Sequence, residues 1–117
     1  MSCVAYKKFD INQGATWQLV LLWKNPDLTP VNVTGYSVVI QFRKTVRGAI
    51  VLYEMSTTNG KVTLDGPAGK ITALAPKEDT STFTFDSAVF DVLATSPSGV
   101  ASRLINATIR VIPAVTR

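Results

Sequence analysis

The chain has 117 residues, of which 46% are hydrophobic and 17% are charged. This length provides one hydrophobic core, and the composition is too apolar for intrinsic disorder, which needs low hydrophobicity and high net charge. The formal net charge is +4, but the twelve Lys and Arg residues are scattered and form no basic stripe with interleaved aromatic residues. The sequence therefore predicts one folded domain that binds no nucleic acid.

Cysteine content and hydropathy bear on the compartment. Cys3 is the only cysteine, so we expect neither an intramolecular disulfide nor a cysteine-based zinc site, and a free thiol suits a reducing compartment. The first ten residues lack the apolar run of a signal peptide, and the longest apolar stretch, residues 19–23, is far shorter than the roughly 20 residues that span a bilayer. These features predict synthesis in a cytoplasm and no membrane segment.

Period-two alternation of apolar residues predicts strands in the first half of the chain. Residues 15–24 form the first of these strands. Residues 36–44 and 49–55 alternate in the same way, and the short segment between them predicts a hairpin. The large side chains that recur at period two in the first strand, and that are expected to face the core, are Trp17, Leu19, Leu21 and Trp23.

The second half of the chain continues with short strands separated by turn residues. Residues 62–64 and 70–75 are two short strands, and residues 76–82 are interpreted as a bridging loop. Residues 88–95 and 100–112 then form the longest hairpin. Alternation places Val51, Tyr53 and Met55 opposite Ile50, Leu52 and Glu54, and it places Ala101, Arg103, Ile105, Ala107, Ile109 and Val111 on one side of the last strand.

Six or seven short strands without an amphipathic helix indicate an all-β fold, an antiparallel sandwich or barrel, and of these we predict a single antiparallel β-sandwich. We predict an immunoglobulin-like sandwich of about seven strands over residues 15–117, preceded by an N-terminal arm or first edge strand over residues 1–14. The Cys, Trp, Cys framework of antibody domains is lacking, so the prediction concerns the architecture and not that family.

The sequence predicts no enzyme activity. It contains no histidine, which removes the commonest general base, the commonest metal ligand and every Ser-His or Cys-His nucleophile pair. No acidic loop has the spacing of a calcium site, and the glycines near Lys70 lack the pattern of a phosphate-binding loop. We therefore expect no catalytic, cofactor-binding or metal-binding residues.

Apolar residues on the nominally outer strand faces suggest protein contacts. An arm containing further apolar residues could pair with the sheet edge of a neighbour. The densest basic group lies at the end of the predicted hairpin. The candidate interface residues are Val20, Leu22, Val39, Ile50 and Leu52 on the strands, Val4, Tyr6 and Phe9 in the arm, and Arg43 and Arg47 in the basic group.

The order of segments resembles a group of small tailed-bacteriophage virion proteins over most of the chain. The resemblance rests on Asp10-Ile-Asn-Gln-Gly-Ala-Thr-Trp17, Leu19-Val-Leu-Leu-Trp23, Val33-Thr-Gly-Tyr36, Val39-Ile-Gln-Phe-Arg43, Thr58-Asn-Gly60, Gly69-Lys-Ile71, Phe90-Asp-Val92, Ser98-Gly99, Arg103-Leu104 and residues 111–117. None of these is a catalytic signature. Residues 80–85 depart from the pattern, because relatives tend to have a short Ala- and Leu-rich helical stretch there.

The resemblance implies a virion structural protein. We expect a copy-repeated module of the tail or baseplate that connects parts or attaches fibres or spikes, with other virion proteins and copies of itself as partners. Capsid decoration is the alternative. A carbohydrate-binding adhesion module is a further alternative, which would use exposed aromatic rings such as Tyr6, Tyr36, Tyr53 or a tryptophan.

Overall fold

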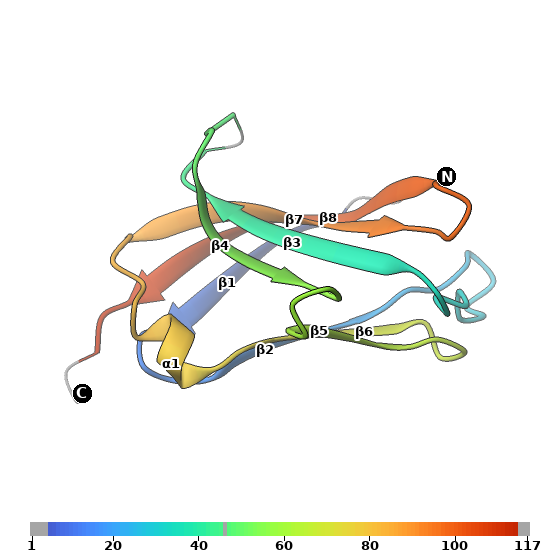
Figure 1. Cartoon of the computed structure of the whole chain (residues 1–117), viewed down its shortest axis with the longest axis horizontal. Coiled ribbons are helices and arrows are strands. Elements are labelled where there is room, and N and C mark those ends of the chain that lie inside the picture. The colour runs from blue at the N-terminus through green and yellow to red at the C-terminus, as the bar shows by residue number, and fades with distance from the viewer. Residues whose placement is uncertain (1–4, 46, 115–117) are drawn as a thin grey trace.

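The computed structural model describes residues 5–45 and 47–114, the first two of them by their backbone alone. This part of the chain contains eight strands and one helical turn, packed as two facing sheets (Figure 1). The elements are β1 (Ala5–Asn12), β2 (Trp17–Leu22), β3 (Ser37–Arg43), β4 (Val51–Ser56), β5 (Val62–Asp65), β6 (Lys70–Ala75), α1 (Lys77–Thr80), β7 (Ser87–Thr95) and β8 (Ala101–Ile112).

The five-stranded sheet has the order β1-β8-β7-β3-β4, and the three-stranded sheet has the order β2-β6-β5. In an immunoglobulin-like sandwich, strands B, E and D face a sheet that contains G, F and C. β2, β6 and β5 correspond to the first set, and β8, β7 and β3 correspond to the second. The predicted all-β, immunoglobulin-like sandwich is therefore confirmed. It has eight strands where about seven were expected, and it is not wholly antiparallel, because β1 runs parallel to β8.

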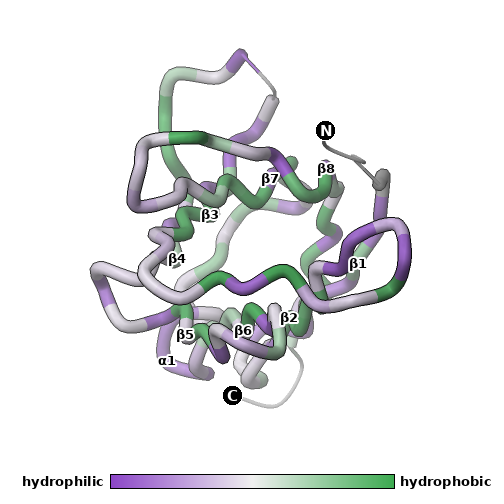
Figure 2. The backbone as a smooth tube through the Cα atoms, turned by 90° about the vertical axis from the view of Figure 1, so that its right-hand side faces the viewer, coloured by the Kyte–Doolittle hydropathy of each residue, from purple (hydrophilic) through white to green (hydrophobic). Residues whose placement is uncertain are grey.

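The core lies between the two sheets, and hydrophobic and hydrophilic residues alternate along the strands that enclose it (Figure 2). Phe42 is fully buried near the centre. Its ring centroid lies 5.2 Å from that of Phe90, 5.5 Å from that of Tyr53 and 6.1 Å from that of Trp17. Other fully buried residues of the core come from both sheets: Ile11, Val38, Ile40, Met55, Ile71, Val92 and Ile109.

Two β-bulges reverse face assignments made from strict alternation. In the β3–β4 ladder, Phe42 pairs with Tyr53 and Arg43 pairs with Val51, so Leu52 is the extra residue. Leu52 packs against the core and Val51 is exposed, opposite to the prediction. The cause is the inserted residue, which shifts the period by one.

The second bulge lies in the β7–β8 ladder. Asp91 pairs with Asn106 and Leu93 pairs with Arg103. One residue therefore lies between these pairs on β7 and two lie between them on β8. Arg103 is consequently exposed, although alternation placed it on the same side as the buried Ile105. The prediction for the first part of this strand was wrong for the same physical reason.

Residues 77–80 form a helical turn, where a bridging loop was predicted. Pro76 precedes the turn, with its fixed backbone angle suited to a helix start, and Glu78 and Asp79 place negative charge near the amide end. The buried Thr80 hydroxyl donates hydrogen bonds to the backbone oxygens of Ala15 and Lys77. This contact with the start of β2 is a tertiary effect that stabilises a turn too short to form alone.

Candidate functional site

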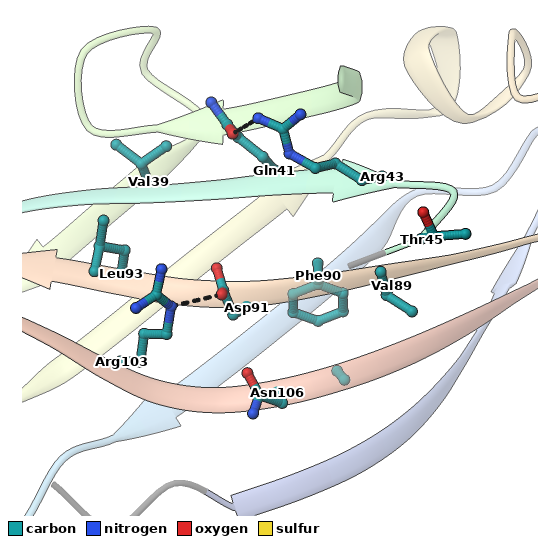
Figure 3. Close-up of a pocket in the computed structure, with 11 residues that line it drawn as sticks. Val39, Gln41, Arg43, Thr45, Val89, Phe90, Asp91, Leu93, Arg103 and Asn106 are labelled. Atoms are coloured by element: carbon teal, nitrogen blue, oxygen red, sulfur yellow. Dashed lines mark hydrogen bonds and ion pairs between the residues drawn. The ribbon is translucent and has the colours of Figure 1, made fainter. Parts of the chain in front are cut away.

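A depression of about 550 Å³ lies on the outer face of the five-stranded sheet, over β3, β7 and β8 (Figure 3). Polar and apolar side chains alternate around it. We call it the sheet-face depression. Its lining consists of Val39, Gln41, Arg43, Thr45, Val89, Phe90, Asp91, Leu93, Arg103, Asn106 and Ala107.

The hollow follows from strand alternation and from the two bulges. Odd-numbered residues of β3 and β7 point outward because their even-numbered neighbours fill the core. Arg43 lies at one bulge, and the segment from Asp91 to Leu93 lies at the other. Bulges bend a strand and increase its twist, so two of them around one region curve the sheet and leave a concave outer face.

A hydrogen-bonded chain of side chains fixes one wall of the depression. The Gln41 amide donates to Glu54 Oε1 over 2.8 Å, and its oxygen accepts a hydrogen bond of the same length from Arg43 Nη2. Arg43 Nη1 donates to the backbone oxygen of Gly48 over 2.8 Å. Arg43 therefore connects the depression to the β3–β4 connection and is held in one orientation.

The opposite wall carries an ion pair across the β7–β8 bulge. Arg103 Nε donates to Asp91 Oδ2 over 2.8 Å (Figure 3). Both side chains are substantially solvent-exposed, so the pair itself contributes little to stability. Its consequence is geometric, because the carboxylate holds the guanidinium plane beside the depression and leaves its terminal nitrogens to bind other acceptors.

The electrostatic character of this face is basic. Arg43 and Arg103 line the depression, and the exposed Lys44 and Arg47 lie on the adjoining connection. Asp91 is the one carboxylate in the lining. Such an arrangement can bind carboxylates and carbonyl oxygens through charge-assisted hydrogen bonds, while the apolar residues between the arginines exclude water.

The β3–β4 connection extends beyond the sandwich (Figure 1), and Thr45 on this connection lines the sheet-face depression. Ile50 lies on it with 75% of its surface exposed, and Arg47 is exposed as well. An isoleucine exposed to this degree on a projecting connection is suited to contact another molecule.

Six of the ten predicted interface residues lie at the surface, in three separate places. Val39 and Arg43 meet at the sheet-face depression, and Arg47 and Ile50 lie on the adjoining connection. Val20 and Leu22 are exposed on the other sheet, away from this site. The structure does not bring all of them together.

Two of the candidates are corrected to core positions, and two cannot be placed as side chains. Phe9 packs inward, with its ring centroid 5.8 Å from that of Trp17 and 5.9 Å from that of Phe90, and Leu52 also packs against the core. Tyr6 has a described backbone that pairs with Asn106, but its side chain lies outside the described residues, as does all of Val4.

Sequence reasoning missed several residues of the depression. Gln41 and Asp91 alternate with core residues of their strands, so the period alone could have placed them on this face. Arg103 could not have been found in this way, because the bulge that turns it outward leaves no signal in the pattern.

Both tryptophans face the core, as their period predicted. Trp17 packs edge-to-face on Phe42, and Trp23 packs edge-to-face on Tyr36 at 5.9 Å. Both indole rings are partly buried and form part of the core packing.

Tyr53 connects the aromatic cluster to α1. Its hydroxyl donates a hydrogen bond to Asp79 Oδ2. The same carboxylate oxygen forms an ion pair with Lys61 Nζ at 3.4 Å. Burial and the adjacent Asp79 carboxylate raise the pKa of Tyr53 well above its usual range.

The raised Tyr53 pKa predicts a loss of stability in alkali. Because the folded protein holds this proton more tightly than the unfolded chain, the contribution is fully present below about pH 10 and is lost as the pH rises further. Y53F should show a weaker decline of unfolding free energy above pH 10 than the wild type in urea titrations. A decline of equal steepness in both proteins would contradict this role.

Within residues 5–45 and 47–114, no group of three or more Asp, Glu, His or Cys side chains converges to hold a metal ion. Across these two ranges no helix has the length and apolar character needed to cross a membrane.

No protein-family model matches this chain, and no curated protein is significantly similar to it. Among solved structures, it is similar to the extracellular domains 3–5 of Drosophila OTK, with 12% sequence identity and a TM-score of 0.39. The match covers 93% of this chain and 33% of the OTK chain, so this chain spans about a third of the length of that three-domain structure.

Proposed function

We propose that this chain is a non-enzymatic structural module of a tailed-bacteriophage particle. In this proposal, several copies assemble in the tail or baseplate, where each connects neighbouring proteins or attaches a fibre or spike. The support is the resemblance that runs through most of the sequence, together with a sandwich whose outer face is built for contact. Other virion proteins are the partners, and chemistry on a substrate plays no part.

The sheet-face depression is the observation that carries a docking role. A solvated outer sheet face is ordinarily polar. Here Val39, Val89 and Leu93 lie among the arginines of the same hollow. Apolar side chains with interspersed arginine are the composition of an interface core.

The chemistry of the depression also defines the partner surface that would fit it. The two lining arginines and the nearby Lys44 and Arg47 outnumber the lining carboxylate, Asp91. A complementary partner would present carboxylates or backbone carbonyls to the guanidinium groups and an apolar residue to Leu93. The projecting Ile50 would then contact the rim of the same partner.

The location and copy number of the protein in purified particles test the proposal. Quantitative mass spectrometry of separated heads and tails should find it in tails at the few copies per particle of a cyclic ring. Hundreds of copies in head fractions would instead support capsid decoration. Absence from both fractions would overturn the virion proposal and favour the carbohydrate-binding alternative.

A pair of leucine variants tests the docking face itself. L93E places a carboxylate in the sheet-face depression next to Asp91, and we expect incorporation into particles to fall at least about tenfold, because an interface hot-spot change costs about 2 kcal/mol. L28E is the matched control, since Leu28 is exposed on the loop that follows β2, outside the depression lining. Equal incorporation of both variants would contradict docking through this face.

A further inference from the structure

Residues 5–45 and 47–114 form four sheet edges, and of these only the edge of β2 has no feature that blocks pairing with a further strand. Natural sheets protect their edges with charges, bulges or very short strands, because unpaired backbone groups attract further strands. β1 carries the exposed Lys7 and Lys8. β4 has a bulge, and β5 is four residues long and ends at Asp65.

β2 differs from these three in composition and in regularity. Its sequence, Trp-Gln-Leu-Val-Leu-Leu, contains no charged residue and no proline, and its ladder with β6 runs without a bulge. Val20 and Leu22 are 47% and 58% exposed. A neutral, regular strand with exposed apolar side chains is suited to accept another strand.

The fold also leaves a vacant strand position beside β2. In an immunoglobulin sandwich the first strand completes the order A-B-E-D, next to strand B. Here the first described strand, β1, joins the other sheet beside β8, so the three-stranded sheet ends at β2. None of residues 5–45 or 47–114 forms a ladder with this edge of β2.

Hydrogen-bond parity identifies which backbone groups the vacant edge presents. The Trp23 N–H donates to the Gly69 oxygen on the β6 side, and residues of an antiparallel strand point their backbone groups to alternate sides. Residues 17, 19 and 21 therefore bond toward β6. The backbone groups of Gln18, Val20 and Leu22 point to the free edge.

We propose that the free edge of β2 pairs antiparallel with β2 of a second copy, about a twofold axis at Val20. This register places Val20 opposite Val20 of the second copy and Gln18 opposite Leu22. Residues whose backbone groups point to the free edge therefore face each other in pairs, and each pair exchanges two backbone hydrogen bonds. The proposal rests on the proposed function in taking the chain to act in several copies, and it names one contact between them.

Two identical chains of net charge +4 repel each other least where the contact surface carries no charged residues, and the β2 edge is such a surface. Copies meeting through the sheet-face depression would bring Arg43 and Arg103 against their own equivalents, and copies meeting through β1 would do the same with lysines. In the β2 pairing, Lys24 lies opposite Thr16 of the other copy, so no like charges are juxtaposed. The exposed Val20 side chains instead meet each other.

Sedimentation equilibrium of the full chain from micromolar to millimolar concentration tests the pairing. The wild type should show a concentration-dependent dimer. V20P should weaken it roughly 30-fold or more, because two backbone hydrogen bonds are lost at the axis. The monomer should keep its fold, since an edge strand tolerates proline where the N–H faces solvent. V20T keeps the N–H and serves as the matched control that still dimerises.

A charge exchange at the same position tests the register. V20K and V20E should each be monomeric, because the twofold axis sets like charges opposite one another, and an equimolar mixture should form a heterodimer. A monomeric wild type, a dimer that V20P leaves unchanged, or a mixture without heterodimer would each overturn the proposal. Such a failure is distinct from failure of the proposed function, which is judged by whether particles contain the protein. Circular dichroism verifies that each variant is folded.

Discussion

Replacing Phe42 with alanine is expected to lower the free energy of unfolding by about 3–5 kcal/mol. Phe42 is fully buried, and four aromatic rings surround it. Trp17 belongs to one sheet, and Tyr53 and Phe90 belong to the other, so the substitution opens a cavity that neither sheet can close by moving alone. A domain of this size has a stability of about 5–15 kcal/mol, so the loss is a large part of the total. Urea unfolding followed by tryptophan fluorescence measures it.

F85A is the matched control for this variant. Phe85 is half-buried and stacks on Phe83 at 5.0 Å, at the edge of the same cluster. Its truncation leaves a space that solvent can fill, so we expect a loss roughly half that of F42A. If F42A fails to fold, F42L retains most of the volume and keeps the comparison measurable. Equal losses for Phe42 and Phe85 truncations would contradict a central role for Phe42.

Replacing Gly69 with alanine should cost roughly 3 kcal/mol of unfolding free energy, from two separate causes. Gly69 has a φ of +64°, a conformation that costs other residues about 1–2 kcal/mol. In addition, an added Cβ would lie 2.5 Å from the Trp23 oxygen and 2.7 Å from the Val31 oxygen. These are backbone atoms that cannot rotate away, so the end of β2 must shift from the β5–β6 turn. Thermal and urea unfolding measure the loss.

G60A separates the two causes. Gly60 has a similar φ of +80°, but nothing lies within 4 Å of an added Cβ. Its substitution should therefore cost only the conformational term, about 1–2 kcal/mol. The difference between G69A and G60A is the energetic cost of the close approach. If the two variants lose the same stability, the chain around Trp23 and Val31 is not held against Gly69 in solution.

The interaction residues were only partly predictable. Outer-face apolar residues such as Val20 and Val39 could be identified from period two, and both are accessible in the folded chain. Phe9 was assigned to a surface because a short arm gives no sign of which sheet covers it. Arg103 entered the sheet-face depression only through the β7–β8 bulge.

The sequence by itself determined where most strands lie and which side chains form the core. Alternation predicted that Trp17, Leu19 and Leu21 face the core, and the turn residues between strands identified both hairpins. These features are local: each depends on a few neighbouring residues and on the two-residue period of an extended chain. A sandwich of this class follows from that pattern because every strand must bury one face.

Only the tertiary structure decided how the strands join and where the pattern breaks. β1 pairs with β8, with Ala5 opposite Ile105, and a contact so distant in sequence depends on the packing of the whole core. The bulges at Leu52 and Arg103 arise from the same cause, since register is adjusted between partner strands and not within one. The edge of β2 is vacant because β1 pairs with β8 in the other sheet. Which sheet β1 joins depends on the packing of the whole core, so no single segment of the sequence predicts it.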